Sequence, residues 1–384
     1  MSRYYHKGLA LADMAAERFD IVPLRDDMLA TAIGGAALGS LLHESYPDAF
    51  ILCAGPLTGS FAPASGLAVA AFPRQGELCR LPLLQGIGAM LRQCGVDALA
   101  LVGRAGRPLV LRLRRGTGGL ERAKASLHPD HARADLREEL LRDTQDGIAA
   151  LLLAGADSTA LRGAGMHLGS MPQAAALAGA LSDRNCVALV LEGGSPLPPV
   201  PVPADTPLRG RLASTGCFAK ELAARGARLP AGMAWKSAAC YHCPAPCQAW
   251  VKMSAGGYAF CADHQVFAAL IRACGAAAPD ALAACDALGL DPLLAAPLLK
   301  DACSKGARSV DMPAILARAL SEHAVPGGAE PAAQGEDTES MRAGRVLGIC
   351  PHLLRRNPSV TLEDLASLLD EDMRQRLPAA LALA

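Results

Sequence analysis

The chain has 384 residues, of which 51% are apolar and only 4% aromatic, so small and aliphatic side chains must build its core. Lys plus Arg and Asp plus Glu both number 37, which gives a formal net charge of zero. This balance argues against a nucleic-acid-binding protein, because that class carries an excess of basic residues.

The N-terminal sequence has no apolar core of a signal peptide, and no uncharged apolar run reaches the ~18 residues of a membrane span. We therefore expect a cytoplasmic protein without a membrane or nucleic-acid partner. The chain has 13 cysteines. In a reducing compartment, clustered cysteines are more often metal ligands than disulfides.

The first elements are a hairpin, predicted over residues 8–24, and a helix, predicted over 25–45 from its apolar spacing. Gly34, Gly35 and Gly39 inside that helix would weaken it. Their presence indicates close packing against another backbone.

Strands and helices then alternate up to residue 192. We predict strands over 49–54, 67–72, 96–102, 109–113, 148–153 and 187–192, the third and fourth joined by a turn, and helices over 89–94, 135–143 and 171–182. The loop Gly55–Gly66 is rich in glycine and proline. It can present bare N–H groups to an anionic ligand, but its spacing alone favours an ordinary connection.

A proline-rich stretch near 195–207 predicts a linker, so we place the domain boundary there. The predicted domains are a β-rich domain with embedded helices, 1–205, and a mainly α-helical domain, 206–384. In the second domain we expect helices over 208–226 and 262–303, a flexible surface segment over 324–340, and a last helix that begins at the capping box of Thr361. The predicted fold class is α+β.

The sequence Cys240-Tyr-His-Cys243-Pro-Ala-Pro-Cys247 places three cysteines within eight residues. A loop of this kind can direct several thiolates at one metal centre. A four-iron cluster fits this spacing best, a structural zinc site completed by His242 or His264 is the alternative, and cysteines without a ligand are the third interpretation. Cys350 in a glycine turn is the best candidate for a fourth ligand, and Cys261 is its nearer rival.

Several segments together resemble the aldehyde ferredoxin oxidoreductase family of tungsten or molybdenum pterin enzymes. The similarity covers Leu9–Ala37, Gly55–Gly59 with Ala62-Pro63, Cys94–Pro108, the cysteine loop, Cys285–Asp291 and Leu347–Cys350.

The resemblance implies that residues 1–205 cradle a bis-pterin cofactor of tungsten or molybdenum and that Cys350 is the fourth ligand of a [4Fe-4S] cluster, after Cys240, Cys243 and Cys247. It also implies cofactor contacts from two sets of residues: Gly55, Thr58, Gly59 and Pro63 in the first loop, and Asp286, Gly289, Asp291 and Gly348 in two later motifs. The implied reaction oxidises an aldehyde to a carboxylic acid and passes the electrons through the cluster to ferredoxin. Family members often pair, which implies a homodimer.

The sequence departs from the family pattern at three places. Leu67 stands where the family has an arginine that meets pterin phosphate. Gln265 stands where an acid is expected beside the metal, and a glutamine cannot exchange a proton near neutral pH. The stretch between Asp291 and Cys350 is short, where the family carries a long catalytic segment.

These observations leave two candidate functions. The chain is either a compact aldehyde-oxidising enzyme, or a relative that retains the cluster as an electron-transfer or accessory iron–sulfur protein.

Overall fold

The protein is described by a computed structural model, which covers most of the chain. The described residues are 3–83, 86–115, 117–122, 149–153, 174–194, 196–202, 206–213, 218–240, 242–261, 264–288, 290, 292–321 and 337–384. The helix predicted over 135–143 and most of the segment 324–340 lie outside these residues.

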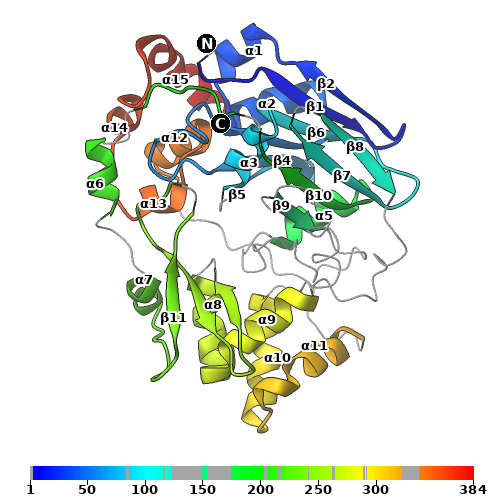
Figure 1. The fold of residues 1–384 in the computed structure, drawn as a ribbon, viewed down its shortest axis with the longest axis vertical. Helices are drawn as coiled ribbons and strands as arrows, with labels where there is room; N and C mark the ends of the chain where they lie inside the picture. The colour runs from blue at the N-terminus through cyan, green and yellow to red at the C-terminus, as the bar shows by residue number, and fades with distance from the viewer. Residues whose placement is uncertain are drawn as a thin grey trace.

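The described residues form three β-sheets (Figure 1). The first has six strands in the order β2-β1-β6-β3-β4-β5 (Arg18–Pro23, Gly8–Asp13, Ala98–Val102, Phe50–Ala54, Ala68–Arg74, Glu77–Leu83). The second has the order β8-β7-β10-β9 (Thr117–Arg122, Leu109–Arg114, Cys186–Glu192, Ala149–Leu153). The third is the antiparallel sheet β11-β12-β13 (Trp235–Ala238, Gln248–Lys252, Tyr258–Cys261), and it lies in the lower part of the view.

The apolar side chains of strand β3 belong to two different hydrophobic cores. Because successive side chains of a strand point to opposite faces, Phe50 and Leu52 face one side and Ile51 and Cys53 face the other. The first pair joins an inter-sheet core, which we define as the apolar side chains between the first two sheets together with α3 (Ile87–Gln93) and α5 (Ala174–Ser182). The strand is therefore buried on both faces and needs no polar alternation.

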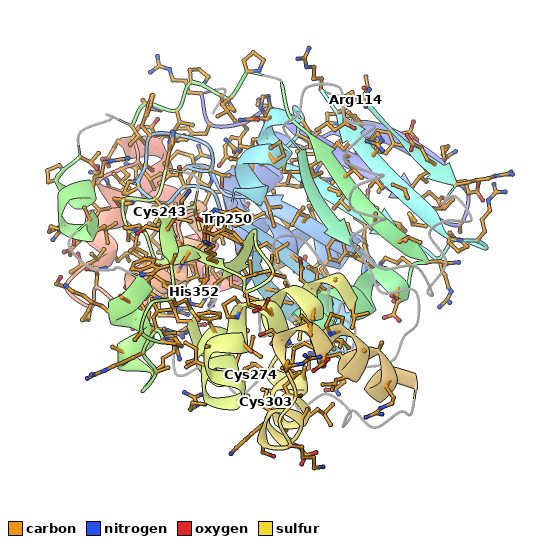
Figure 2. The ribbon with its side chains drawn as sticks, turned by 60° about the horizontal axis from the view of Figure 1, so that its bottom comes forward. Arg114, Cys243, Trp250, Cys274, Cys303 and His352 are labelled. Carbon is orange, nitrogen blue, oxygen red and sulfur yellow. The ribbon has the colours of Figure 1, made fainter. Side chains whose placement is uncertain are left out.

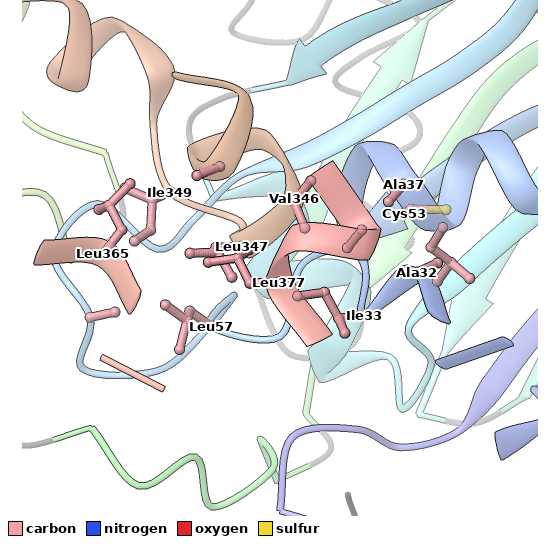
Figure 3. Close-up of a cluster of buried hydrophobic side chains, with 14 of the residues drawn as sticks. Ala32, Ile33, Ala37, Cys53, Leu57, Val346, Leu347, Ile349, Leu365 and Leu377 are labelled. Atoms are coloured by element: carbon pink, nitrogen blue, oxygen red, sulfur yellow. The ribbon is translucent and has the colours of Figure 1, made fainter. Parts of the chain in front are cut away.

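The second face of the first sheet is covered by helices from both ends of the chain (Figure 3). These are α1 (Asp26–Ala32), α2 (Gly35–Ser45), α12 (Glu339–Leu347), α13 (Pro351–Arg355), α14 (Leu362–Ala366) and α15 (Glu371–Leu383). Ile33 and Ala37 thus meet Val346, Leu347 and Leu377 in one core. The C-terminal helices return to the N-terminal sheet, whereas the helices and strands between residues 218 and 321 form the lower part of Figure 1.

That lower part is the third sheet with helices α7 (Phe218–Ala224), α8 (His264–Cys274), α9 (Ala278–Leu288), α10 (Pro292–Ser304) and α11 (Met312–Ser321). Its apolar side chains form a separate cluster, which we call the lower core; Phe218, Phe267 and Leu299 are among its fully buried members. A short helix, α6 (Pro207–Ala213), lies between the two parts in sequence.

One helical run in the lower part, His264–Leu288, is long and apolar enough to cross a membrane by length and composition. Its apolar residues include Val266, Phe267, Ala281 and Leu282, which are buried in the lower core. A core helix passes the same test, so this run is weak support for a membrane span.

The α+β class is confirmed, as are the hairpin, the strand positions up to residue 192 within the described residues, and the capping box at Thr361. Several details differ. The predicted helix 25–45 is two helices, because Ile33 has a φ of 48° and Gly34 one of 141°. The helix 208–226 is likewise α6 and α7, and α15 follows the helix that was predicted to be last.

Two differences concern the sheets. Strands β6 and β7 were expected to be joined by a simple turn, but they belong to different sheets. The predictions also missed β5, β8 and the sheet β11-β12-β13 around the cysteine loop. The proposed boundary near residue 205 stays a prediction.

Gly34 and Gly35 do pack against a backbone, as expected, whereas a Cβ atom on Gly39 would meet the side chain of Ala71. Gly35 has a φ of +50°, and a Cβ atom on it would lie 2.0 Å from the carbonyl oxygen of Arg345. Helix α2 can therefore approach the end of α12 only because position 35 has no side chain.

We expect Gly35→Ala to lower the free energy of unfolding by about 3 kcal/mol or more, because the methyl group forces α2 away from α12. Gly106→Ala is the control, since its Cβ would meet nothing within 4 Å, and it should change stability by about 0.5 kcal/mol or less. Urea unfolding of both variants measures the difference. Equal stabilities would contradict the close approach of α2 and α12.

Candidate metal centre

The glycine-rich loop Gly55–Gly66 is held by the hydroxyl group of Thr58. This hydroxyl accepts a hydrogen bond from the amide of Gly55 at 2.9 Å and donates one to the carbonyl of Leu67 at 3.0 Å. Thr58 is buried, so both bonds are shielded from water. One side chain therefore fixes the start of the loop against its end.

The same loop packs tightly against the turn Leu347–Cys350, which lies far away in the sequence. The amide of Leu57 donates to the carbonyl of Leu347 at 3.0 Å. A Cβ atom on Gly55 would lie 2.2 Å from the amide nitrogen of Gly348. A Cβ on Gly348, whose φ is +89°, would lie 2.0 Å from the hydroxyl oxygen of Thr58. Glycine at both positions is thus explained by close packing.

Ala64 connects this loop to two predicted metal-ligand segments. Its amide donates to the carbonyl of His242 at 3.0 Å, and its carbonyl accepts from the amide of Cys350 at 3.2 Å. His242 also reaches the loop through its side chain: Nδ1 lies 2.7 Å from the carbonyl oxygen of Ser60, and the ring stacks on Phe61. The cysteine loop and Cys350 are therefore attached to the same short piece of backbone.

Three of the four predicted ligand thiols share one environment. Burial raises the pKa of the Cys350 thiol to about 12, and the thiols of Cys243 and Cys247 raise it further. Burial likewise raises the pKa of Cys243 to about 11, with Cys247 adding to the effect. Cys240 begins the turn, since its carbonyl accepts from the amide of Cys243 at 3.0 Å. The raised pKa values keep the Cys243 and Cys350 thiols protonated near pH 7, and a bound metal would stabilise their thiolate forms.

The described residues do not bring three or more His, Cys, Asp or Glu side chains together around a single ion. His264, a candidate zinc ligand, uses both ring nitrogens elsewhere. Its Nε2 hydrogen-bonds the carbonyl of Cys247, and Nδ1 lies 3.3 Å from Nη2 of Arg356, which can only donate. Burial lowers the pKa of His264 to about 4, and Arg356 lowers it further, so this ring is neutral near pH 7.

The guanidinium of Arg356 places a positive charge beside the Cys243 thiol, and the sequence does not predict this neighbour. Arg356 pairs with Glu221, Nε to Oε1 at 3.1 Å, while its buried Nη1 has no hydrogen-bond partner. Its charge acts on Cys243 and lowers the pKa of that thiol against the larger effect of burial. His352, marked with Cys243 in Figure 2, has a pKa lowered to about 4 by burial and then by Arg356. The sequence signal is the pair Arg355-Arg356, which follows Cys350 within two helical turns.

The remaining predicted residues lie elsewhere or outside the described part. Cys261, the rival ligand, is fully buried in the lower core at the end of β13. Asp286 lies in α9, which Figure 1 places in the lower part, whereas Gly348 follows α12 in the upper part. Gly289 and Asp291 lie outside the described residues. Pro63 is buried in the loop beside Ala64.

Residues 9–182 match the aldehyde ferredoxin oxidoreductase N-terminal domain. Among solved structures, the chain is similar to the active site complex BamBC of benzoyl coenzyme A reductase in complex with 1,5-dienoyl-CoA, with a TM-score of 0.59 and 13% identity. The similarity covers 84% of this chain and 61% of that one, so the chain spans less than two thirds of this structural relative. At this identity the likeness shows the fold alone. No curated protein matches the chain.

We expect Thr58→Val to lower the free energy of unfolding by about 2 kcal/mol, because it leaves the buried amide of Gly55 and carbonyl of Leu67 without their partner. Thr31→Val is the matched control: the Thr31 hydroxyl also donates to a carbonyl, that of Asp27, but at an exposed site. Denaturant unfolding should show little change for that variant. An equal effect of both substitutions would contradict the role of Thr58 in fixing the loop.

Proposed function

We propose that the chain is an electron-transfer iron–sulfur protein of the aldehyde ferredoxin oxidoreductase family, whose N-terminal domain matches residues 9–182. Its [4Fe-4S] cluster is held by Cys240, Cys243, Cys247 and Cys350. The observation that carries this proposal is the double hydrogen bond of Ala64, which joins the cysteine loop to Cys350.

A four-iron cluster suits this arrangement better than zinc does. Such a cluster bonds its thiolates to separate iron atoms, so the thiols surround a volume and need not converge on one ion. A structural zinc site needs four ligands in tetrahedral contact with a single ion. His264 cannot complete that set, since both of its ring nitrogens are engaged.

The residues around the thiols also fit a negatively charged cluster. When bound, the cluster supplies one-electron transfer. The chain itself supplies a buried setting for Cys350, which is 8% exposed, and the guanidinium of Arg356 with an unpaired Nη1. A positive charge near a cluster favours its reduced and more negative form.

The described residues predicted to bind the pterin fit that group poorly. Thr58 has its hydroxyl occupied in both directions, and the amides of Gly55, Gly59 and Gly348 donate to Thr58, Ser65 and Gly344 respectively. Leu67 is buried and uncharged where the family has an arginine. The Thr58 hydroxyl and these three amides are already used within the protein, so we derive no catalytic step through a pterin.

Oxidation of an aldehyde to a carboxylic acid is the second candidate function. The match of residues 9–182 favours it, because the family name describes that reaction. It would need tungsten- or molybdenum-bis-pterin, held by residues beyond those described. For either function we propose a ferredoxin-like electron carrier as partner, a cytoplasmic location and a homodimer.

The ligand assignment is tested by Cys350→Ser and Cys261→Ser in anaerobically purified protein. We expect Cys350→Ser to lose most of the visible absorption and iron, because it removes the proposed fourth ligand, whose thiol lies close enough to Cys243 and Cys247 for them to raise its pKa. Cys261→Ser should keep both, since that thiol is buried in the lower core. The opposite pattern would assign the fourth ligand to Cys261.

The role of Arg356 is tested by the midpoint potential of the cluster. We expect Arg356→Met to lower this potential by tens of millivolts, because it removes the positive charge that favours the reduced form and leaves Glu221 unpaired. Arg356→Lys should recover part of the loss. Arg355→Met is the control, since Arg355 is exposed and neighbours Arg356 in sequence. A potential that Arg356→Met leaves unchanged would refute this role.

A further inference from the structure

Two cysteines outside the candidate metal centre meet in the lower part of the molecule. Cys274 is the last residue of α8, and Cys303 lies in the last turn of α10. These helices pack against each other, and both cysteines lie at the edge of the lower core. Their thiols share a hydrogen bond, and Figure 2 shows the two residues beside each other.

We propose that Cys274 and Cys303 form a reversible redox site, which reacts with small disulfides such as oxidised glutathione and closes an internal disulfide between α8 and α10.

The position of the pair favours this bond, because the two thiols already lie within hydrogen-bonding distance of each other. The sulfur atoms of a disulfide lie about 2 Å apart. The thiols therefore need only a small further approach, between two helices that already pack together. The bond would connect two helices that are linked through α9, and it would restrain the lower core on its exposed side.

Access distinguishes this pair from the other cysteines of the lower core. Cys274 and Cys303 are both partly exposed, and the adjoining residues Gly275 and Ser304 are exposed. Cys261 and Cys285 are fully buried. A small disulfide in solution can therefore reach the pair but not its neighbours.

The first attack is assigned to Cys303. Burial raises the pKa of Cys274 to about 12, and the neighbouring Cys303 raises it further. Cys274 therefore keeps its proton and is a poor nucleophile, so the Cys303 sulfur attacks first.

The reaction is a thiol–disulfide exchange in two steps. The Cys303 sulfur attacks glutathione disulfide, which breaks the glutathione S–S bond, forms a mixed disulfide on Cys303 and releases one glutathione thiol. The Cys274 sulfur then attacks Cys303 in that mixed disulfide and releases the second. Two protein thiols are oxidised, one small disulfide is reduced, and the two protons leave on the released thiols.

The site is tested by mapping the cross-link in the intact protein. The cluster-loaded full chain is incubated anaerobically with oxidised glutathione, its free thiols are alkylated, and it is digested with trypsin without reduction. Cleavage after Arg272, Lys300 and Lys305 places Cys274 in peptide 273–300 and Cys303 in peptide 301–305. Mass spectrometry should find these two peptides joined, and reduction with dithiothreitol should separate them. Unlinked peptides would overturn the proposal.

Three variants test the roles of the thiols. Cys285→Ser is the control, because Cys285 shares a peptide with Cys274, and the cross-link should persist. Cys274→Ser should accumulate glutathione on Cys303. Cys303→Ser should carry about tenfold less glutathione on Cys274 than Cys274→Ser carries on Cys303, since the first attacking thiol is gone. A cross-link that disappears only in Cys285→Ser would overturn the proposal. The map of the unmodified chain decides the question even if a variant does not fold.

Discussion

The whole candidate site depends on one contact, in which the loop Gly55–Gly66 lies against the turn Leu347–Cys350. The approach is so close that neither Gly55 nor Gly348 has room for a Cβ atom. The backbone of Ala64 then connects this contact to the cysteine loop. The return of the C-terminal helices to the N-terminal sheet, with Val346 and Leu347 in its core, is what brings Cys350 to Cys243 and Cys247.

Polar groups on the two sides of this contact differ in whether they have hydrogen-bond partners. On the loop side, the amides of Gly55 and Gly59 and the hydroxyl of Thr58 are satisfied within the protein. On the cysteine side, the Cys243 thiol lies near Arg356, and the buried Nη1 of that arginine has no hydrogen-bond partner. Buried groups without partners are costly, so they mark the place where a bound group would contribute most. This contrast is the reason to favour an electron-carrying centre over a pterin enzyme.

The sequence predicts the local features well, because local rules determine them. Apolar runs predict β3 and β10, the Thr361 capping box predicts α14, and the glycines of α2 predict a close backbone contact. The sequence does not predict which distant strands pair with each other. The turn after β6 looks like a hairpin connection, but β6 pairs with β1 and β3 while β7 pairs with β8 and β10. β5 was missed because Arg80 and Pro82 interrupt its apolar pattern, which an edge strand tolerates. Spacing predicts the ligand loop around Cys243, but it cannot show that Arg356 lies beside it.

The metal and pterin content of anaerobically purified protein tests the central claim most directly. The account predicts about four iron atoms per chain, together with neither tungsten nor molybdenum and no pterin fluorescence after extraction. Iron accompanied by tungsten or molybdenum and a pterin would contradict the electron-transfer function and support aldehyde oxidation. Zinc without iron would contradict both.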